Sequence, residues 1–512
     1  MFRKRFPASS ALLLPCYLCG ILACLPHASG LHAGDFPNIL ILYADDLGYG
    51  DLSCQNADSR IPTHHLDRLA SQGLRCTDGH SSSGICTPSR YALLTGRYHW
   101  RDFHGIVGPL GGSVFKSDQL TLPKMLKHKG YETACIGKWH LGWNWDAIRT
   151  NANRKSIEPE SFDWSKPVPD GPLAHGFDHY FGDSVINFPP YAWIKDDRLV
   201  EPPTMLMRTS LWKPIKEGNW ECRPGPMVQD WNPYNVLPTL ADAGVTYLKQ
   251  RKHKSAPFFL YFAFPCPHAP IIPNDAFDGT SQAGPYGDFV VETDAVVGRL
   301  LDALDHAGLT ENTLVIFTAD NGPEQYAYAR DKDYHHWSSE PFRGLKRDIY
   351  EGGHHVPFIV RWPHVIPAGM KTEALISQVD IMATVAAIVD YPLPKSAAHD
   401  SLNQLPVFKT NRQEVRTQHV HNTRSNSYAM RSGKWLLINA KSGYMSKVDN
   451  DWLSRRHYPE DDSQAVELFD LSLDPGQKHN LAMAHPGVVE TLQQQLLIIQ
   501  EQGFSAPRVQ SQ

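Results

Sequence analysis

The stretch Asn38-Ile39-Leu40-Ile41-Leu42-Tyr43 is a continuous apolar run that ends in Ala44-Asp45-Asp46. A short apolar run without polar alternation is typical of a strand that is buried on both faces of a sheet. The stretch Leu314-Val315-Ile316-Phe317-Thr318 repeats the pattern and ends in Ala319-Asp320-Asn321-Gly322. We expect the two strands to bring their acidic residues to one edge of a sheet, where open α/β sheets bind their ligands.

Apolar runs and amphipathic segments alternate around these two strands. We expect further strands at 258–264 and 358–362, and helices at 67–72, 122–129, 293–307 and 378–385. This alternation predicts an α/β fold in which helices cover both faces of the sheet. From about residue 396 the sequence is polar and rich in turns, with short strands expected at 428–431, 434–438 and 467–471 and a helix near 488–500. We therefore predict a catalytic domain over residues 31–395 and a smaller C-terminal α+β domain, an antiparallel sheet with a helix, over 396–512.

The composition excludes several classes of protein. The chain has 512 residues, of which 42% are hydrophobic, and this is enough apolar material for a large core. Overall disorder and a coiled coil are thereby excluded. The 49 basic and 54 acidic residues give a net charge of −5, and no long basic run is present. Nucleic acid is therefore not an expected partner.

The first thirty residues have the pattern of an export signal. Basic residues at 1–5 precede an apolar run at 11–25, and Ala28-Ser29-Gly30 supplies small residues for cleavage. We expect a signal peptide over residues 1–30 and a mature chain that is periplasmic or secreted. The run is shorter than the roughly 20 residues of a membrane span, so no stable span is expected. Cys24 lies in a loose lipoprotein box, which leaves a lipid anchor as an alternative. The six cysteines beyond residue 30 show no CxxC spacing that would predict a zinc site.

One motif is much more specific than these patterns. Cys86-Thr87-Pro88-Ser89-Arg90 is followed by Thr95-Gly96-Arg97. These residues resemble the sulfatase signature, C-x-P-x-R with a downstream T-G-R, and the resemblance extends over nearly all of the exported chain. It implies an alkaline-phosphatase-like fold with a large mixed sheet. It also implies that a formylglycine-generating maturation enzyme oxidises Cys86 to formylglycine.

The resemblance implies one bound divalent cation, usually calcium. Its ligands in this sequence would be Asp45, Asp46, Asp320 and Asn321 at the two strand ends, together with the modified Cys86. Carboxylate and amide oxygens suit Ca²⁺ or Mg²⁺ better than zinc.

Three further segments resemble conserved blocks of sulfatases, namely Gly137-Lys138-Trp139-His140-Leu141-Gly142, Pro267-His268-Ala269-Pro270 and Gly344-Leu345-Lys346 with the following Glu351-Gly352-Gly353 and Val356-Pro357. The resemblance implies that Lys138 and Arg90 orient an aldehyde hydrate at residue 86. It implies that Asp320 helps to deprotonate the attacking hydroxyl and that His268 protonates the leaving oxygen, which Lys346 stabilises. It also implies that His140 takes the proton of the second hydroxyl. The chain has His354-His355 where many relatives have an arginine before Val-Pro.

Substrate selection is less clearly marked. Segments 176–182 and 188–191 look like the pocket insertion of the arylsulfatase A and N-acetylgalactosamine-6-sulfatase branch. An aromatic and cationic set precedes the Lys346 block and would suit a sulfated sugar, namely His335, His336, Trp337 and Arg343. Core packing explains Trp337 equally well.

The leading hypothesis is hydrolysis of sulfate monoesters, on a sulfated carbohydrate. Two alternatives stay open from the residues. A formylglycine-dependent phosphonate monoester or phosphodiester hydrolase would share the Cys86 motif. A catalytically inactive binder of sulfated polysaccharide would leave Cys86 unmodified.

Overall fold

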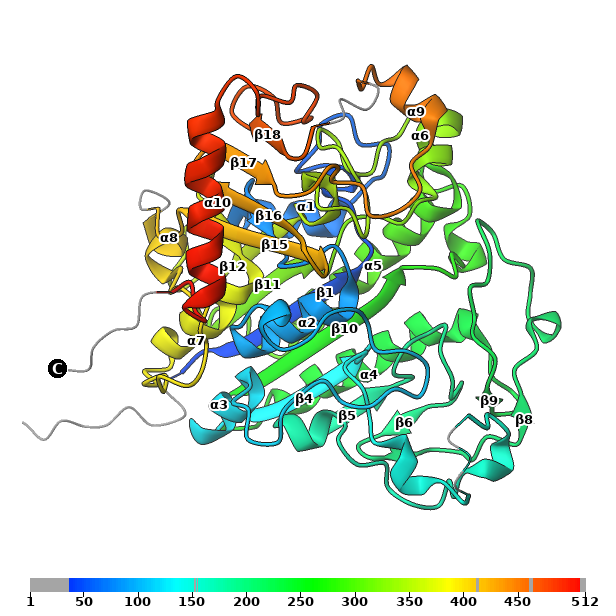
Figure 1. Cartoon of the computed structure of the whole chain (residues 1–512). Helices are drawn as coiled ribbons and strands as arrows, with labels where there is room; N and C mark the ends of the chain where they lie inside the picture. Colours follow the sequence, from blue (N-terminus) through cyan, green and yellow to red (C-terminus); the bar gives the residue numbers. More distant parts are fainter. Residues whose placement is uncertain (1–35, 152, 154, 411–413, 460–463, 507–512) are drawn as a thin grey trace, which may run out of the picture. The chain divides into compact units, whose positions relative to one another are not determined.

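Ten strands form one mixed sheet (Figure 1), in the order β13-β2-β12-β11-β1-β10-β4-β5-β6-β7. Strand β1 (Asn38–Asp45) lies between β11 (Thr313–Ala319) and β10 (Phe258–Pro267) and is parallel to both. The carboxyl ends of these three strands therefore meet at one edge of the sheet. The other strands are β2 (Leu74–Cys76), β4 (Glu132–Gly137), β5 (His179–Gly182), β6 (Ile194–Lys195), β7 (Arg198–Leu199), β12 (Phe358–Arg361) and β13 (Met370–Thr372).

Each face of the sheet has its own core. Ile39 and Ile41 of β1 face one core, whereas Leu40 and Leu42 face the other. Helices α1 (His64–Ser71), α4 (Val236–Arg251) and α5 (Gly284–His306) cover the face of Leu40, and α2 (Cys86–Thr95), α3 (Leu122–His128) and α7 (Ile381–Ile388) cover the opposite face. The predicted sheet with helices on both faces is confirmed.

Helix α5 begins at Gly284, well before the expected residue 293. Two buried acidic residues account for the difference. Asp288 accepts hydrogen bonds from the backbone N–H groups of Gly279 and Ser281, and Glu292 accepts one from the backbone N–H of Asn274. These polar residues on the buried side of the helix interrupt the apolar period from which the helix was predicted.

A four-stranded antiparallel sheet forms the C-terminal part, as predicted, in the order β15 (Gln418–Arg424), β16 (Ser427–Ser432), β17 (Trp435–Ile438) and β18 (Glu467–Asp470). Helix α10 (Pro486–Glu501), red in Figure 1, packs against one face through Leu496. The other face packs against Ile349 and Tyr350. This sheet therefore contacts the segment that follows Lys346. The remaining elements are β3 (Gly79–His80), β8 (Met205–Leu206), β9 (Pro226–Met227), β14 (Ile376–Ser377), α6 (Ala327–Tyr334), α8 (Leu405–Thr410) and α9 (Asn450–Arg455).

The computed structural model describes residues 36–151, 153, 155–410, 414–459 and 464–506. The expected signal peptide and Cys24 lie outside the described residues. Within the described ranges, every helix is too short or too polar to cross a bilayer.

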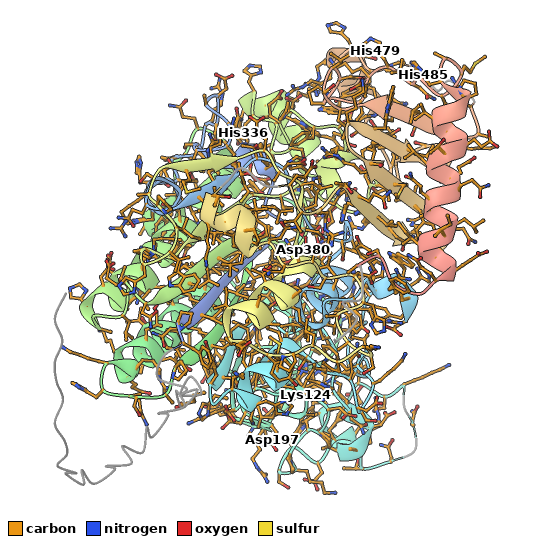
Figure 2. All side chains as sticks on the ribbon, turned by 90° about the vertical axis from the view of Figure 1, so that its left-hand side faces the viewer. Lys124, Asp197, His336, Asp380, His479 and His485 are labelled. Atoms are coloured by element: carbon orange, nitrogen blue, oxygen red, sulfur yellow. The ribbon has the colours of Figure 1, made fainter. Side chains whose placement is uncertain are left out.

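A buried ion pair connects the segment before β15 to Asp380, which lies near the end of the large domain. Asp380 (Figure 2) accepts hydrogen bonds from Nε and Nη2 of Arg416, and both residues are almost completely buried. Arg416 also donates to the backbone oxygen of Asp400 at 2.6 Å. Removal of one partner of such a pair leaves an uncompensated charge in the interior.

We expect Arg416→Met to lower the free energy of unfolding by about 3–5 kcal/mol, because Asp380 then stays buried without its cation. Urea unfolding followed by tryptophan fluorescence measures the change. The matched control is Arg299→Met, which breaks the exposed pair with Asp242 and should cost less than about 1 kcal/mol. Equal losses in the two variants would contradict the assigned role of the buried pair.

Candidate active site

Cys86 is the first residue of helix α2, and its side chain lies at the edge of the sheet where β1 and β11 end. Ile85 is extended, Pro88 fits the first turn of the helix, and Gly96 ends the helix in a left-handed conformation. Ser89 donates a hydrogen bond to the backbone oxygen of Ser83 and so fixes the loop before the helix. The local sequence therefore places Cys86, which is 3% exposed, at a defined helix start.

The ends of β1 and β11 are joined through their acidic residues. Asp46 has a positive φ of 62°, and its N–H donates to Asp320 Oδ1 at 3.2 Å. Asn321 Nδ2 donates to Asp46 Oδ1 at 2.7 Å. Asp45, Asp46, Asp320 and Asn321 are at most 1% exposed. The structure thus brings together the four residues predicted at the two strand ends.

Two cations from separate segments pair with this carboxylate group. Arg90 Nη2 lies 2.7 Å from Asp320 Oδ2 and 3.5 Å from Asp45 Oδ1. Lys138 Nζ donates to Asp45 Oδ2. Gly137 has a φ of 104°, and a Cβ at this position would lie 2.0 Å from the backbone oxygen of Ala263. Only glycine therefore allows the turn that directs Lys138 toward Asp45.

A third cation reaches the site from the segment after β11. Lys346 Nζ donates to Asp46 Oδ2 at 2.8 Å and lies 3.6 Å from Glu324 Oε2. Burial lowers the pKa of Lys346, but Asp46 and Glu324 raise it by more, so the side chain stays protonated. Arg347 donates to Glu324 Oε1 at 2.6 Å. Glu324 and Arg347 lie outside the motif positions recognised in the sequence and were not predicted.

The charges of the carboxylates are unequal. Burial raises the pKa of Asp45, yet Lys138, His268 and Arg90 together hold it well below its usual value. Burial and the negative charge of Asp45 raise the pKa of Asp320 well above its usual value, against the opposing effect of Arg90. The positive charges around Asp45 and Asp320 are therefore too few to keep both carboxyl groups fully ionised.

The donor set fits a hard divalent cation. Among the described residues, Asp45 Oδ1 and Asn321 Oδ1 are buried without a hydrogen-bond partner. Asp45, Asp46 and His268 also present donor atoms within 4.8 Å of one another. Buried carboxylate and amide oxygens that lack a hydrogen-bond partner, among carboxylates that outweigh the nearby positive charge, are what Ca²⁺ or Mg²⁺ would bind.

The two predicted histidines flank Cys86. His140 has a φ of 52°, and its Nε2 lies 2.9 Å from the backbone oxygen of Val107. Its Nδ1 has no hydrogen-bond partner within the described chain. Burial, together with Lys138 and Arg90, lowers the pKa of His140 well below its usual value, so the ring is neutral and can accept a proton. His268 Nε2 lies 3.8 Å from Asp46 Oδ2.

A cavity of about 270 Å³ opens over these groups, and Cys86, His140, His268 and Lys346 all line it. The structure thus brings four of the six predicted catalytic side chains, from four segments, to one cavity, whereas Arg90 and Lys138 contact the carboxylates. The other lining residues are Ile85, Gly105, Ile106, Asn187, Phe188, Glu221, Arg223, Arg347, Thr423 and Arg424.

The structure does not bring the four predicted substrate-binding residues into this cavity. His336 (Figure 2) is buried, and its Nε2 lies 2.8 Å from Asp51 Oδ1. Trp337 packs in an apolar cluster around Trp452. Arg343 donates to the hydroxyl of Tyr444 and to the backbone oxygen of Gln477, and the exposed His335 ends helix α6. These contacts give His336, Trp337 and Arg343 structural roles. We propose no substrate contact for these three residues or for His335.

Comparison with known proteins agrees with this geometry. The sulfatase family model matches residues 37–391, and the model of the C-terminal part of N-sulphoglucosamine sulphohydrolase matches residues 344–502. The chain belongs to the sulfatase family. Sulfatases generally use formylglycine and a divalent metal ion.

Individual sulfatases match along most of the chain. An N-acetylgalactosamine-6-O-sulfatase of Bacteroides thetaiotaomicron is 32% identical over 493 residues, which cover 90% of this chain and 92% of that protein. Arylsulfatase A of Bos taurus is 33% identical and covers 89% of this chain and 85% of its own length. A solved structure described under the metabolism of multiple glycosaminoglycans by Bacteroides thetaiotaomicron superposes with a TM-score of 0.75 at 29% identity, covering 91% and 99% of the two chains. This sulfatase is therefore a sulfuric ester hydrolase.

We expect Lys346→Met to lower kcat/KM for an aryl sulfate by about 10²–10³-fold, because the cavity loses a fixed positive charge. Steady-state kinetics measure the loss. Lys332→Met removes an exposed lysine of α6 and should leave the rate unchanged. Circular dichroism establishes that both variants fold. Wild-type kinetics in folded Lys346→Met would contradict a role for this lysine.

Proposed function

We propose that this sulfatase hydrolyses a sulfate monoester of a sugar and that the reaction occurs at residue 86, after a maturation enzyme has converted Cys86 to formylglycine. The observation that carries the proposal is the cavity in which Cys86 lies beside His140, His268 and Lys346, above the paired carboxylates. A sulfate monoester is an anion and gains charge on the leaving oxygen, so a site with several fixed cations stabilises its transition state.

We propose that Ca²⁺, with Mg²⁺ as the alternative, binds to Asp45, Asp46, Asp320 and Asn321 together with residue 86. The ion would neutralise negative charge and lower the pKa of a hydroxyl group at residue 86. Arg90 and Lys138, which already contact the carboxylates, would hold these ligands in place and orient the hydroxyl groups.

The proposed reaction uses two proton transfers by histidine. A hydrated aldehyde at residue 86 supplies one hydroxyl to attack sulfur and a second hydroxyl whose deprotonation releases sulfate. Asp320 would help to remove the first proton. His268 would protonate the sugar oxygen as it leaves, with Lys346 stabilising the developing charge. His140 would accept the second proton at Nδ1, the nitrogen that lacks a hydrogen-bond partner among the described residues.

The cavity rim favours an anionic sugar chain. Arg223, Arg347 and Arg424 supply three guanidinium groups, and Asn187 and Glu221 add groups that can bind sugar hydroxyls. Arg347 is paired with Glu324, which leaves Arg223 and Arg424 as the candidates for a second sulfate or a carboxylate. Because the Bacteroides thetaiotaomicron N-acetylgalactosamine-6-O-sulfatase matches over 90% of the chain, we propose a 6-O-sulfated amino sugar as the first candidate substrate.

Export completes the proposal. Residues 1–30 would be removed as a signal peptide, on the evidence of their basic start, apolar run and small residues. A sulfated polysaccharide would then meet the enzyme outside the cytoplasm.

A substrate panel tests the proposed reaction. We expect release of sulfate from N-acetylgalactosamine 6-sulfate at a kcat/KM at least about tenfold above that for the 4-sulfate, since the wrong position leaves polar groups of the site unpaired. The same preparation should hydrolyse an aryl sulfate faster than an aryl phosphonate. Faster phosphonate turnover would overturn the sulfatase proposal in favour of the phosphonate hydrolase, and a preference for the 4-sulfate would overturn the substrate only.

Mass spectrometry of the peptide around Cys86 tests the modification. We expect a loss of about 18 Da relative to cysteine, or about no loss for the hydrate, which treatment with a hydrazine reagent distinguishes from the thiol. Cys86→Ala should abolish sulfate release, whereas Cys54→Ala, a change at a thiol away from the cavity, should not. An active wild-type enzyme whose Cys86 is entirely unmodified would contradict the proposal.

A further inference from the structure

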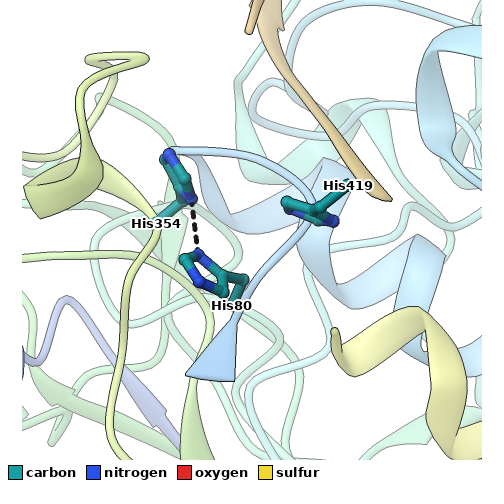
Figure 3. A group of neighbouring side chains, drawn as sticks. All are labelled: His80, His354 and His419. Atoms are coloured by element: carbon teal, nitrogen blue, oxygen red, sulfur yellow. Dashed lines mark hydrogen bonds between the residues drawn. The ribbon is translucent and has the colours of Figure 1, made fainter. Parts of the chain in front are cut away.

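Three histidines, side chains of a type that binds metal ions, form a second cluster next to the loop that leads to Cys86. His80 ends strand β3, His354 follows the Lys346 block, and His419 belongs to β15. Figure 3 shows the three rings directed toward one another from these three segments. Their exposed fractions are 0%, 1% and 2%, so the cluster is fully enclosed.

The spacing of the ring nitrogens suits a shared ion. Nδ1 of His80 and Nδ1 of His354 form a hydrogen bond of 3.1 Å, and one nitrogen of each of the three rings lies within 4.8 Å of the others. Nitrogens bound to one tetrahedral Zn²⁺ at 2.0–2.1 Å are about 3.4 Å apart. The His80–His354 nitrogen distance of 3.1 Å is close to this value.

Carboxylates stand behind two of the rings. His80 Nε2 lies 2.6 Å from Asp78 Oδ1, so its N–H donates outward and the lone pair of Nδ1 points into the cluster. His354 Nε2 lies 3.9 Å from Glu351 Oε1, and both atoms lack a hydrogen-bond partner among the described residues. A histidine that binds a metal usually donates its other N–H to a carboxylate, as His80 does to Asp78; the 3.9 Å between His354 and Glu351 is too long for a hydrogen bond.

The third ring also has an unused nitrogen. His419 Nδ1 lies 3.3 Å from the hydroxyl of Tyr98, whereas its Nε2 has no hydrogen-bond partner within the described ranges. Neutral imidazole is the form that binds metal, and buried nitrogens without partners need some other stabilisation.

We propose that His80, His354 and His419 bind a divalent transition metal, with Zn²⁺ as the first choice, at a structural site separate from the catalytic one. Imidazole donors select zinc, copper or nickel, whereas the oxygen donors of Asp45 and Asp320 select calcium or magnesium. The two sites therefore differ in the metal they bind. This inference does not depend on the proposed substrate or reaction.

The site would fasten three segments that shape the active-site cavity. His80 precedes Cys86 by six residues, and the intervening loop already bonds to both other segments. Ser81 N donates to the backbone oxygen of His354 at 2.9 Å, and Gly84 N donates to Thr423 Oγ1 at 3.3 Å. Because β15 carries both His419 and the cavity residue Thr423, an ion at the cluster would fix the C-terminal sheet against the loop of Cys86.

Metal analysis of the untagged chain tests the site. The protein is expressed with Zn²⁺ and Ca²⁺ in the medium and dialysed against metal-free buffer, and both metals are then measured by inductively coupled plasma mass spectrometry. We expect about one zinc per wild-type chain. His354→Gln and His419→Gln should weaken zinc binding by at least the about 10–100-fold that loss of an outer-shell partner causes. The matched control is His479→Gln, a change at an exposed histidine labelled in Figure 2, which should keep the zinc.

The calcium content of the same samples shows whether the catalytic site binds its metal. Loss of zinc alone and loss of calcium alone therefore identify which of the two proposed sites is wrong. If the variants do not fold, Co²⁺ added to the wild-type chain replaces them as the probe. We expect visible absorption bands of cobalt bound to imidazole, which Zn²⁺ abolishes. A wild-type chain that holds no zinc, zinc retained in both folded variants, or cobalt without such bands would overturn the proposal.

Discussion

The pairing of buried opposite charges at the joined ends of β1 and β11 is the constraint on which the active site depends. Charges taken out of water are strongly unfavourable unless they are paired in good geometry. Each carboxylate here has a cation from a different segment, so three loops must converge before any charge is compensated. The pairs are Arg90 with Asp320, Lys138 with Asp45, and Lys346 with Asp46.

The stability of the central sheet offsets the unfavourable burial of these charges. Strands β1, β10 and β11 are apolar on both faces and anchor two large cores, which hold their carboxyl ends in register. The polar cluster lies just beyond those ends, where the first turns of α2 and several loops surround it. Stability therefore comes mainly from the sheet and its helices, and the loops are free to carry charges that by themselves oppose folding.

Site residues could be predicted from the sequence where a local pattern also determines their position in the sheet. Asp45 and Asp320 were expected together because each ends an apolar strand, and the motif around Cys86 identified the family. The sequence left substrate binding and core packing equally open for Trp337, because proximity in sequence to Lys346 does not tell which way a side chain points, and its partner Trp452 is far along the chain. Arg424 was missed for the same reason: β15 reaches the cavity only through tertiary packing, which no local pattern records.

The departure of this chain from many relatives at His354-His355 gains a physical meaning from the packing. His354 stacks on His421 of β15 with ring centroids 3.6 Å apart. The segment from Lys346 to His354 holds a catalytic cation at one end and an imidazole of the histidine cluster at the other. The segment from His80 to Cys86 has the same arrangement. Each segment thus has one end at the active-site cavity and the other at the histidine cluster, and His419 and Thr423 of β15 lie one at each.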